Sequence, residues 1–132
     1  MIVADASFLS PVVGDDGALG AAARFTLEVE PECVLPNLAD IEVVSVLRKQ
    51  WLAGTMTEAR CIRAIRYLAA LPFPRYEASP LLERAFELRS TVTVYDGVYV
   101  ALAERLGATL VTMDGRLARA PGIRCRVHLF RP

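Results

Sequence analysis

The chain has 132 residues, which is long enough for one domain with a buried core and too short for a second. Its 15 basic and 15 acidic residues cancel, which excludes a generally basic nucleic-acid-binding surface. Hydrophobic residues make up 54% of the chain, more than a lone domain of this size needs, so we expect apolar surface to be buried against a partner.

Export and membrane insertion are not predicted. The longest stretch without a charged residue is nine, residues 6–14, whereas a membrane span needs about 18. Asp5 interrupts the apolar N-terminus and no basic segment precedes it, so we expect no signal peptide and a cytoplasmic protein. The three cysteines have no C-x-x-C spacing and are odd in number, which indicates neither a disulfide framework nor a zinc site.

The first half of the chain is predicted to begin with a buried strand. Residues 1–4 are apolar without alternation, and Asp5 ends the run. The other elements predicted here are a turn of helix over 8–13, a helix over 18–29, a strand over 33–36, an amphipathic helix from 36 or 37 to Trp51, and a helix to about Leu71 that follows a capping-box spacing from Thr55 to Glu58.

In the second half, Pro72 and Pro74 break the chain before an edge strand near residues 75–77. The elements predicted after it are helices over 79–89 and 95–106, a strand over 108–113, a short helix over 114–119 and a last strand near 126–129. Strands separated by helices predict a single α/β domain over residues 1–132, with a central parallel β-sheet flanked by helices on both faces.

Four carboxylates stand where such a sheet would bring them together. Asp5 and Asp114 follow predicted strands, and parallel α/β sheets bind ligands at the carboxyl ends of their strands. Asp96 begins a helix that is apolar nearly all round, and Glu42 lies on a mostly apolar helix face. Taken singly, each aspartate is explained more simply as a helix cap, and a mid-helix glutamate is most often solvated.

The combination of the four is more informative than any one of them. Clustered carboxylates repel one another and must be compensated, and no lysine lies near them in the sequence. Oxygen-only ligands suit Mg²⁺ or Mn²⁺, which points to phosphoryl chemistry. Ser7 and Thr112 each lie two residues from an aspartate and could hold either the attacking water or a carboxylate. A turn serine and a strand threonine without a chemical role are slightly simpler interpretations.

Four segments carry a resemblance to a known family: "IVADAS", "LADIEVVSVLRK", "VYDGVYVALAERLGA" and "LVTMDGRLARAPG". In this order they resemble the successive blocks of PIN-domain ribonucleases, in particular the VapC toxins of bacterial toxin and antitoxin pairs. The resemblance places the family's acidic quartet and its accompanying hydroxyl on the following residues: Asp5, Glu42, Asp96, Asp114 and Thr112.

The resemblance also implies a function and partners. It implies a PIN-like fold and a Mg²⁺-dependent endoribonuclease that leaves a 5′-phosphate and a 3′-hydroxyl, with transfer RNA or ribosomal RNA as substrate. It implies a homodimer, and a cognate antitoxin received in a groove formed by the apolar residues Phe8, Leu9, Val12 and Val13 together with the helix that follows them. The chain departs mildly from the family where Gly97 replaces a common alanine and where Arg116 replaces a further acid of some members, which bears on the second metal position.

Arginines offer two candidate contacts to RNA phosphates. Arg116 and Arg119 follow Asp114 within a turn or so of helix, and together with Ser7 they form the predicted substrate-binding set. Arginines at 60, 63 and 66 form a basic stripe along one helix, for which a solvated face is the simpler explanation.

Two other functions fit parts of the pattern. A non-catalytic PIN-like module that binds RNA or protein would keep the fold without needing the acids. A phosphoacceptor receiver domain also clusters aspartates on a small parallel α/β fold, but its chemistry requires a lysine near them. Lys49 is badly placed for this role, because it lies inside the long predicted helix.

Overall fold

The computed structural model describes residues 1–30 and 32–132. Its strands form one sheet in the order β3-β2-β1-β4-β5, and every neighbouring pair is parallel. The strands are β1 (Ile2–Ala4), β2 (Cys33–Pro36), β3 (Arg75–Tyr76), β4 (Thr109–Thr112) and β5 (Val127–Leu129). Because all strands run the same way, the residues that follow them collect at one edge of the sheet.

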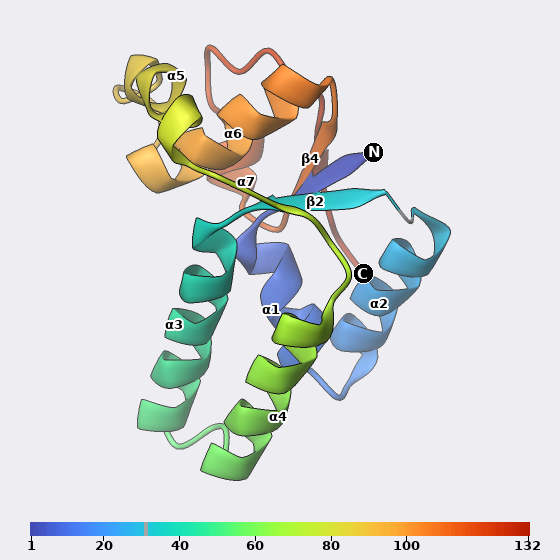
Figure 1. The fold of residues 1–132 in the computed structure, drawn as a ribbon. Helices are drawn as coiled ribbons and strands as arrows, with labels where there is room; N and C mark the ends of the chain where they lie inside the picture. The colour runs from blue at the N-terminus through green and yellow to red at the C-terminus, as the bar shows by residue number, and fades with distance from the viewer. Residues whose placement is uncertain (31) are drawn as a thin grey trace.

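Helices cover both faces of this sheet, as predicted (Figure 1). On one face lie α6 (Val94–Leu106) and α5 (Leu82–Glu87), and on the other lie α1 (Ala6–Gly14) and α2 (Ala18–Val29). The remaining helices are α3 (Leu38–Leu52), α4 (Glu58–Ala70), the 3₁₀ turn η1 (Ser79–Leu81) and α7 (Gly115–Ala118). In Figure 1, α3 and α4 run side by side away from the sheet.

Helix starts differ from the prediction in three places. The first helix is longer than the turn predicted over 8–13, because Asp5 caps it and it continues through Pro11. The cap of α4 is Thr57, whose hydroxyl accepts the Arg60 amide at 3.1 Å, so the predicted capping box from Thr55 was wrong. At α6, Thr93 is the cap and accepts the Asp96 amide at 3.1 Å, which leaves the Asp96 carboxylate without a capping role.

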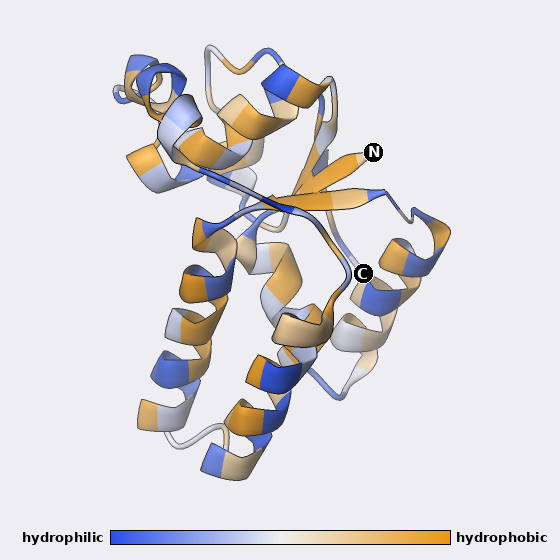
Figure 2. Cartoon of the chain, viewed as in Figure 1, coloured by the Kyte–Doolittle hydropathy of each residue, from blue (hydrophilic) through white to orange (hydrophobic). Residues whose placement is uncertain are grey.

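The core lies between the sheet and its helices. The strand residues Val3, Leu35 and Leu110 are fully buried, and Figure 2 shows β1 and β2 coloured as hydrophobic along their length. Phe8 and Phe130 pack edge to face with their ring centroids 5.1 Å apart, which joins α1 to the segment after β5. All three cysteines are free thiols, and burial raises the pKa of Cys33 to about 12, which makes it unreactive.

One expectation about a binding groove is corrected in part. The region of Phe8, Leu9, Val12 and Val13 with the helix after it was expected to form a groove for an antitoxin, but these four side chains are at most 2% exposed and offer almost no surface to a partner. They belong to the core because α1 turns this face toward the sheet and α2. On the following helix, α2, Phe25 and Val29 are each 63% exposed, so that part of the expectation stays a prediction. Exposed apolar side chains also lie on other helices, including α3 and α4. Within the described residues, no helix has both the length and the apolar character needed to cross a bilayer.

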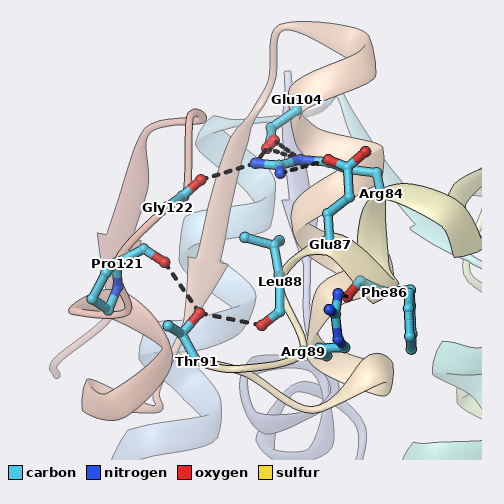
Figure 3. A network of polar contacts seen from close by, with 9 residues as sticks. All are labelled: Arg84, Phe86, Glu87, Leu88, Arg89, Thr91, Glu104, Pro121 and Gly122. Atoms are coloured by element: carbon cyan, nitrogen blue, oxygen red, sulfur yellow. Dashed lines mark hydrogen bonds and ion pairs between the residues drawn. The ribbon is translucent and has the colours of Figure 1, made fainter.

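A polar network holds α5 against α6 (Figure 3). The Arg84 guanidinium donates to both carboxylate oxygens of Glu104, the shortest contact being 2.8 Å, and also to Glu87 and to the Gly122 carbonyl oxygen. Thr91 donates to the Pro121 carbonyl oxygen at 3.1 Å. These bonds connect α5, α6 and the turn after α7. They therefore help to fix the position of α6, the helix that carries Asp96.

Gly97 is explained by the close approach of α5 to α6. A Cβ atom built on Gly97 would lie 2.9 Å from the Ala85 Cα atom and 3.0 Å from its carbonyl oxygen. Real Cβ atoms essentially never come that close to backbone, so the glycine allows the two helices to touch. This accounts for the departure from the alanine that resembling proteins commonly carry next to the aspartate.

We predict that Gly97→Ala destabilises the protein by about 1–3 kcal/mol, because the added methyl group overpacks a backbone contact. The direction of the stability change makes the test specific, because a glycine-to-alanine change inside an unobstructed helix stabilises the protein by about 0.5–1 kcal/mol. Urea unfolding of the two chains measures the difference. A variant as stable as the wild type, or more stable, would contradict the close packing of α5 on α6.

Candidate active site

Asp5 is the most enclosed of the four predicted acids. It follows β1, caps α1 and is only 4% exposed. Its Oδ1 accepts the Phe8 amide at 3.0 Å and the Ser7 hydroxyl at 2.6 Å, and its Oδ2 accepts the Thr112 hydroxyl at 2.5 Å. Three donors therefore hold this carboxylate in one orientation at the junction of β1, β4 and α1.

Ser7 and Thr112 are linked to the backbone as well as to Asp5. The Ser7 hydroxyl accepts the Met113 amide at 2.9 Å, and the Thr112 hydroxyl accepts the Asp114 amide at 3.0 Å. Thr112 is completely buried. Both hydroxyls therefore support the Asp5 carboxylate, which is one of the two roles considered for them. Contact of Ser7 with substrate and a direct part for Thr112 in the chemistry stay predictions.

Asp96 and Asp114 come from α6 and from the end of β4. Asp96 lies in the first turn of α6 and is half-buried. Asp114 caps α7, and its Oδ1 accepts the Arg116 amide at 2.8 Å. The first cause of the raised pKa of Asp96 is burial, and the negative charge of Asp114 raises it further. The two carboxylates are thus near enough to repel each other.

Glu42 reaches the same place from α3. It is half-buried, and its Oε1 accepts the Tyr99 hydroxyl at 2.8 Å, so a side chain on α6 holds a side chain on α3. Burial, followed by the charge of Glu42, raises the pKa of Tyr99 well above its ordinary value, and the phenol therefore remains a donor. The mid-helix glutamate is not simply solvated.

Charge effects on the pKa link the four acids in pairs. Burial raises the pKa of Asp5 and of Glu42, and the charge of Asp96 raises both further. Hydrogen bonds to Ser7 and Tyr99 act in the opposite direction and only partly offset the effect. Carboxylates from the ends of β1 and β4, from α3 and from α6 therefore lie near one another at the carboxyl edge of the sheet, and their part in a catalytic site stays a prediction.

Within the described residues no protein cation neutralises this cluster. The ion pairs found there involve other carboxylates, and none reaches Asp5, Glu42, Asp96 or Asp114. In the same part of the chain, no group of three His, Cys, Asp or Glu side chains stands close enough together to hold a metal ion as the side chains lie. The donor set fits a hard cation, since it consists of carboxylate oxygens alone. The less constrained acids would have to close in on the ion.

The two sets of arginines differ in what they contact. Arg119 folds back over the start of α7, with its Nη1 atom 2.9 Å from where a Cβ atom on Gly115 would lie, and Arg116 is exposed on the same short helix. Arg60 instead donates to Asp16 and to the Val13 carbonyl oxygen, so it fastens α4 to the end of α1. The α7 arginines are the pair beside the acidic cluster.

A large hollow in the described structure lies elsewhere. A cavity of about 670 Å³ opens at the amino end of β4, beside Gly107 and Ala108. Its only carboxylate is Glu104, which Arg84 already holds. This cavity is at the opposite edge of the sheet from Asp114 and does not contain the groups that the candidate site brings together.

Tyr99 is a site residue that the sequence prediction missed. It is 1% exposed and lies three residues after Asp96, so the two side chains share one face of α6. The available signal was a tyrosine in an otherwise apolar buried helix, since a buried phenol almost always needs a hydrogen-bond partner. The sequence alone does not show that the partner is Glu42.

Comparisons with known proteins identify the family of the chain. The family model described as PIN domain matches residues 2–123. Ribonuclease VapC12 of Mycobacterium tuberculosis is 37% identical over 130 residues, which covers 98% of each chain. Ribonuclease VapC1 of the same organism is 38% identical over 130 residues, covering 98% of this chain and 97% of the relative.

A solved structure has the same fold. The crystal structure of Mycobacterium tuberculosis VapC20, titled a sarcin-ricin loop cleaving toxin, aligns over 100% of both chains with a TM-score of 0.71 at 18% identity. At that identity the likeness speaks for the fold alone. The parallel sheet, the acidic edge and the full-length relatives together show that this chain belongs to the PIN-domain family and is similar throughout its length to the VapC ribonucleases.

Proposed function

We propose that the protein is a Mg²⁺-dependent endoribonuclease that acts as the toxin of a toxin and antitoxin pair. The observation that carries this proposal is the gathering of four mutually repelling carboxylates at the carboxyl edge of the sheet without a protein cation among them. Such an arrangement is unfavourable unless a cation joins it. The relatives named ribonucleases support RNA as the substrate.

Asp5, Glu42, Asp96 and Asp114 are the groups that would hold the ion. A bound Mg²⁺ or Mn²⁺ would supply an activated water and charge neutralisation for in-line displacement at phosphorus, with a 5′-phosphate and a 3′-hydroxyl as products. Asp5 is already fixed by Ser7, Thr112 and the Phe8 amide, so it can serve as the rigid member of the set.

The other residues have supporting roles in this proposal. Arg116 lies two residues after Asp114 in α7, and the guanidinium of Arg119, at the end of α7, folds back toward Gly115, so both could hold the phosphates of an RNA strand next to the acids. We place the activity in the cytoplasm because transfer RNA and ribosomal RNA, the substrates that the family resemblance implies, are found there.

A non-catalytic PIN-like module that binds RNA or protein is the alternative. The complete acidic set disfavours it, because a module that only binds has no need to gather four carboxylates against their repulsion. A receiver domain is excluded by membership of the PIN-domain family.

Exposed apolar side chains support an antitoxin and a second copy of the chain as partners. On α3 and α4, Ile41 is 71% and Trp51 is 52% exposed, and Ile62 is also exposed. Beside Asp96, Tyr95 is 64% exposed, and Phe86 on the neighbouring α5 is exposed too. Patches of this kind on a small protein mark contact surfaces. Light scattering of the purified chain, alone and with its antitoxin, measures both associations.

We predict that the purified protein with Mg²⁺ creates discrete new 5′-phosphate ends in total RNA. Asp96→Asn and addition of a chelator should each reduce these ends by about 100-fold or more, because each removes part of the metal site. Glu83→Gln, which changes an exposed carboxylate on α5, is the matched control and should cleave like the wild type. If wild type and Asp96→Asn leave the same ends, the catalytic proposal fails for these RNAs and the binding module replaces it.

Phosphate contact by the α7 arginines predicts a change in salt dependence. Arg116→Ala with Arg119→Ala should weaken RNA binding and lower the slope of log affinity against log salt by about 2, because each lost phosphate contact removes roughly one released counterion. Arg63→Ala with Arg66→Ala removes the same charge from exposed positions on α4 and should leave the slope unchanged. Equal slopes for both double variants would refute a special role for α7. Fluorescence anisotropy with labelled RNA measures the slopes.

Repulsion among the acids predicts how stability depends on pH and metal. A carboxyl group whose pKa is raised in the folded state favours folding below its ordinary value, 3.8 for Asp and 4.5 for Glu, and this contribution is lost as the pH rises through the raised value. In chelator at neutral pH, Glu42→Gln/Asp96→Asn should therefore be more stable than the wild type by about 1 kcal/mol after solvent screening.

The same two chains supply the control in thermal unfolding. The stability difference should shrink as the pH falls toward the ordinary carboxyl values, and millimolar Mg²⁺ should reverse it, since only the wild type would be stabilised by the ion. A difference that depends on neither pH nor Mg²⁺ would show that repulsion at this site does not govern stability.

A further inference from the structure

The hydrogen bond between Tyr99 and Glu42 joins α6, which carries Asp96, to α3, which carries Glu42. The Tyr99 hydroxyl lies 2.8 Å from Glu42 Oε1, and the residues are 57 positions apart in the chain. The Tyr99 ring is among the largest fully buried side chains, so the core fixes the position of its hydroxyl. The phenol is therefore a rigid donor pointed at a carboxylate.

The position of the Glu42 carboxylate depends on one hydrogen-bond donor, whereas that of Asp5 is shared among three. Asp5 receives three hydrogen bonds, from Ser7, Thr112 and the Phe8 amide. In the described chain, the Tyr99 hydroxyl is the one protein donor to the Glu42 side chain. Glutamate has three side-chain torsions, so without that bond its carboxylate can leave the cluster to escape the charges of Asp96 and Asp5.

We infer that Tyr99 is a positioning residue, which holds Glu42 by Oε1 and leaves Oε2 free to bind the ion. The inference rests on the proposed function, because it concerns the same acidic site. Tyr99 acts through Glu42 and does not itself touch the substrate or the ion. It resembles the outer partners that orient metal-binding side chains elsewhere, whose loss typically weakens metal binding by about 10–100-fold.

Tyr99→Phe separates this role from core packing, because it removes the hydroxyl and keeps the ring. The experiment titrates Mn²⁺ into the purified full chain, with heat or paramagnetic resonance as the readout. We expect Mn²⁺ binding to weaken by about 10-fold in Tyr99→Phe. Tyr67→Phe, which removes the hydroxyl of an exposed tyrosine on α4, is the matched control and should bind Mn²⁺ like the wild type.

A double-variant cycle tests whether Tyr99 works through Glu42. If it does, adding Tyr99→Phe to Glu42→Gln should weaken Mn²⁺ binding by less than about 2-fold further, because the carboxylate that it orients is already gone. With RNA as substrate, Tyr99→Phe should lower kcat and leave KM within about 2-fold, since the phosphate contacts are untouched. A purely structural tyrosine would change the urea midpoint and none of these readouts.

The outcomes distinguish this inference from the proposed function. If the wild type binds Mn²⁺ and cleaves RNA while Tyr99→Phe does both equally well, the inference alone is wrong. Equal effects of Tyr99→Phe in the wild-type and Glu42→Gln backgrounds would also overturn it. If the wild type binds Mn²⁺ but does not cleave RNA, the proposed function is wrong, and the Mn²⁺ titration still decides the role of Tyr99. A wild type that binds no Mn²⁺ overturns both.

Discussion

The buried Asp5 carboxylate is the constraint around which the site is built. A charged group that is 4% exposed is tolerated only when its oxygens receive hydrogen bonds, and the chain supplies three donors from α1 and β4. Two of these donors, Ser7 and Thr112, also accept backbone amides next to Asp114. The solvation of one carboxylate thus fixes the geometry of β1, β4 and the start of α7 together.

The remaining acids are held less firmly, and this difference has a chemical use. Asp96 and Glu42 are half-buried. The Glu42 carboxylate accepts one hydroxyl, that of Tyr99, and the backbone amide of Asp96 donates to the hydroxyl of Thr93. Besides burial, the charge of Asp96 raises the pKa of Glu42 and the charge of Asp114 raises that of Asp96, so each carboxylate opposes the ionisation of a neighbour. If the site binds Mg²⁺ as proposed, one rigid ligand with several adjustable ones would allow an ion that keeps some of its waters to enter, and the adjustable ligands would then close on it.

The sequence predicted the fold because the fold depends on local patterns, and the same patterns are the basis for predicting the four acids. Short apolar runs ending in Asp5 and before Asp114 mark strand ends, and parallel strands place such residues at one edge. Details set by tertiary contact were predicted less well. Thr57, rather than Thr55, caps α4, and the 8–13 segment expected to form part of a groove is core, because neither the local spacing nor apolarity shows which face another helix will cover.

The position of α6 links packing to chemistry. This helix carries both Asp96 and Tyr99 on one face, so the depth at which it lies against the sheet sets the aspartate and, through the phenol, Glu42 on α3. Gly97 lies between them and allows α5 to approach to backbone contact, while Arg84 and Glu104 fasten the same two helices further along (Figure 3). Two of the four acids therefore depend on one helix contact, which is why a residue with no side chain matters to the site.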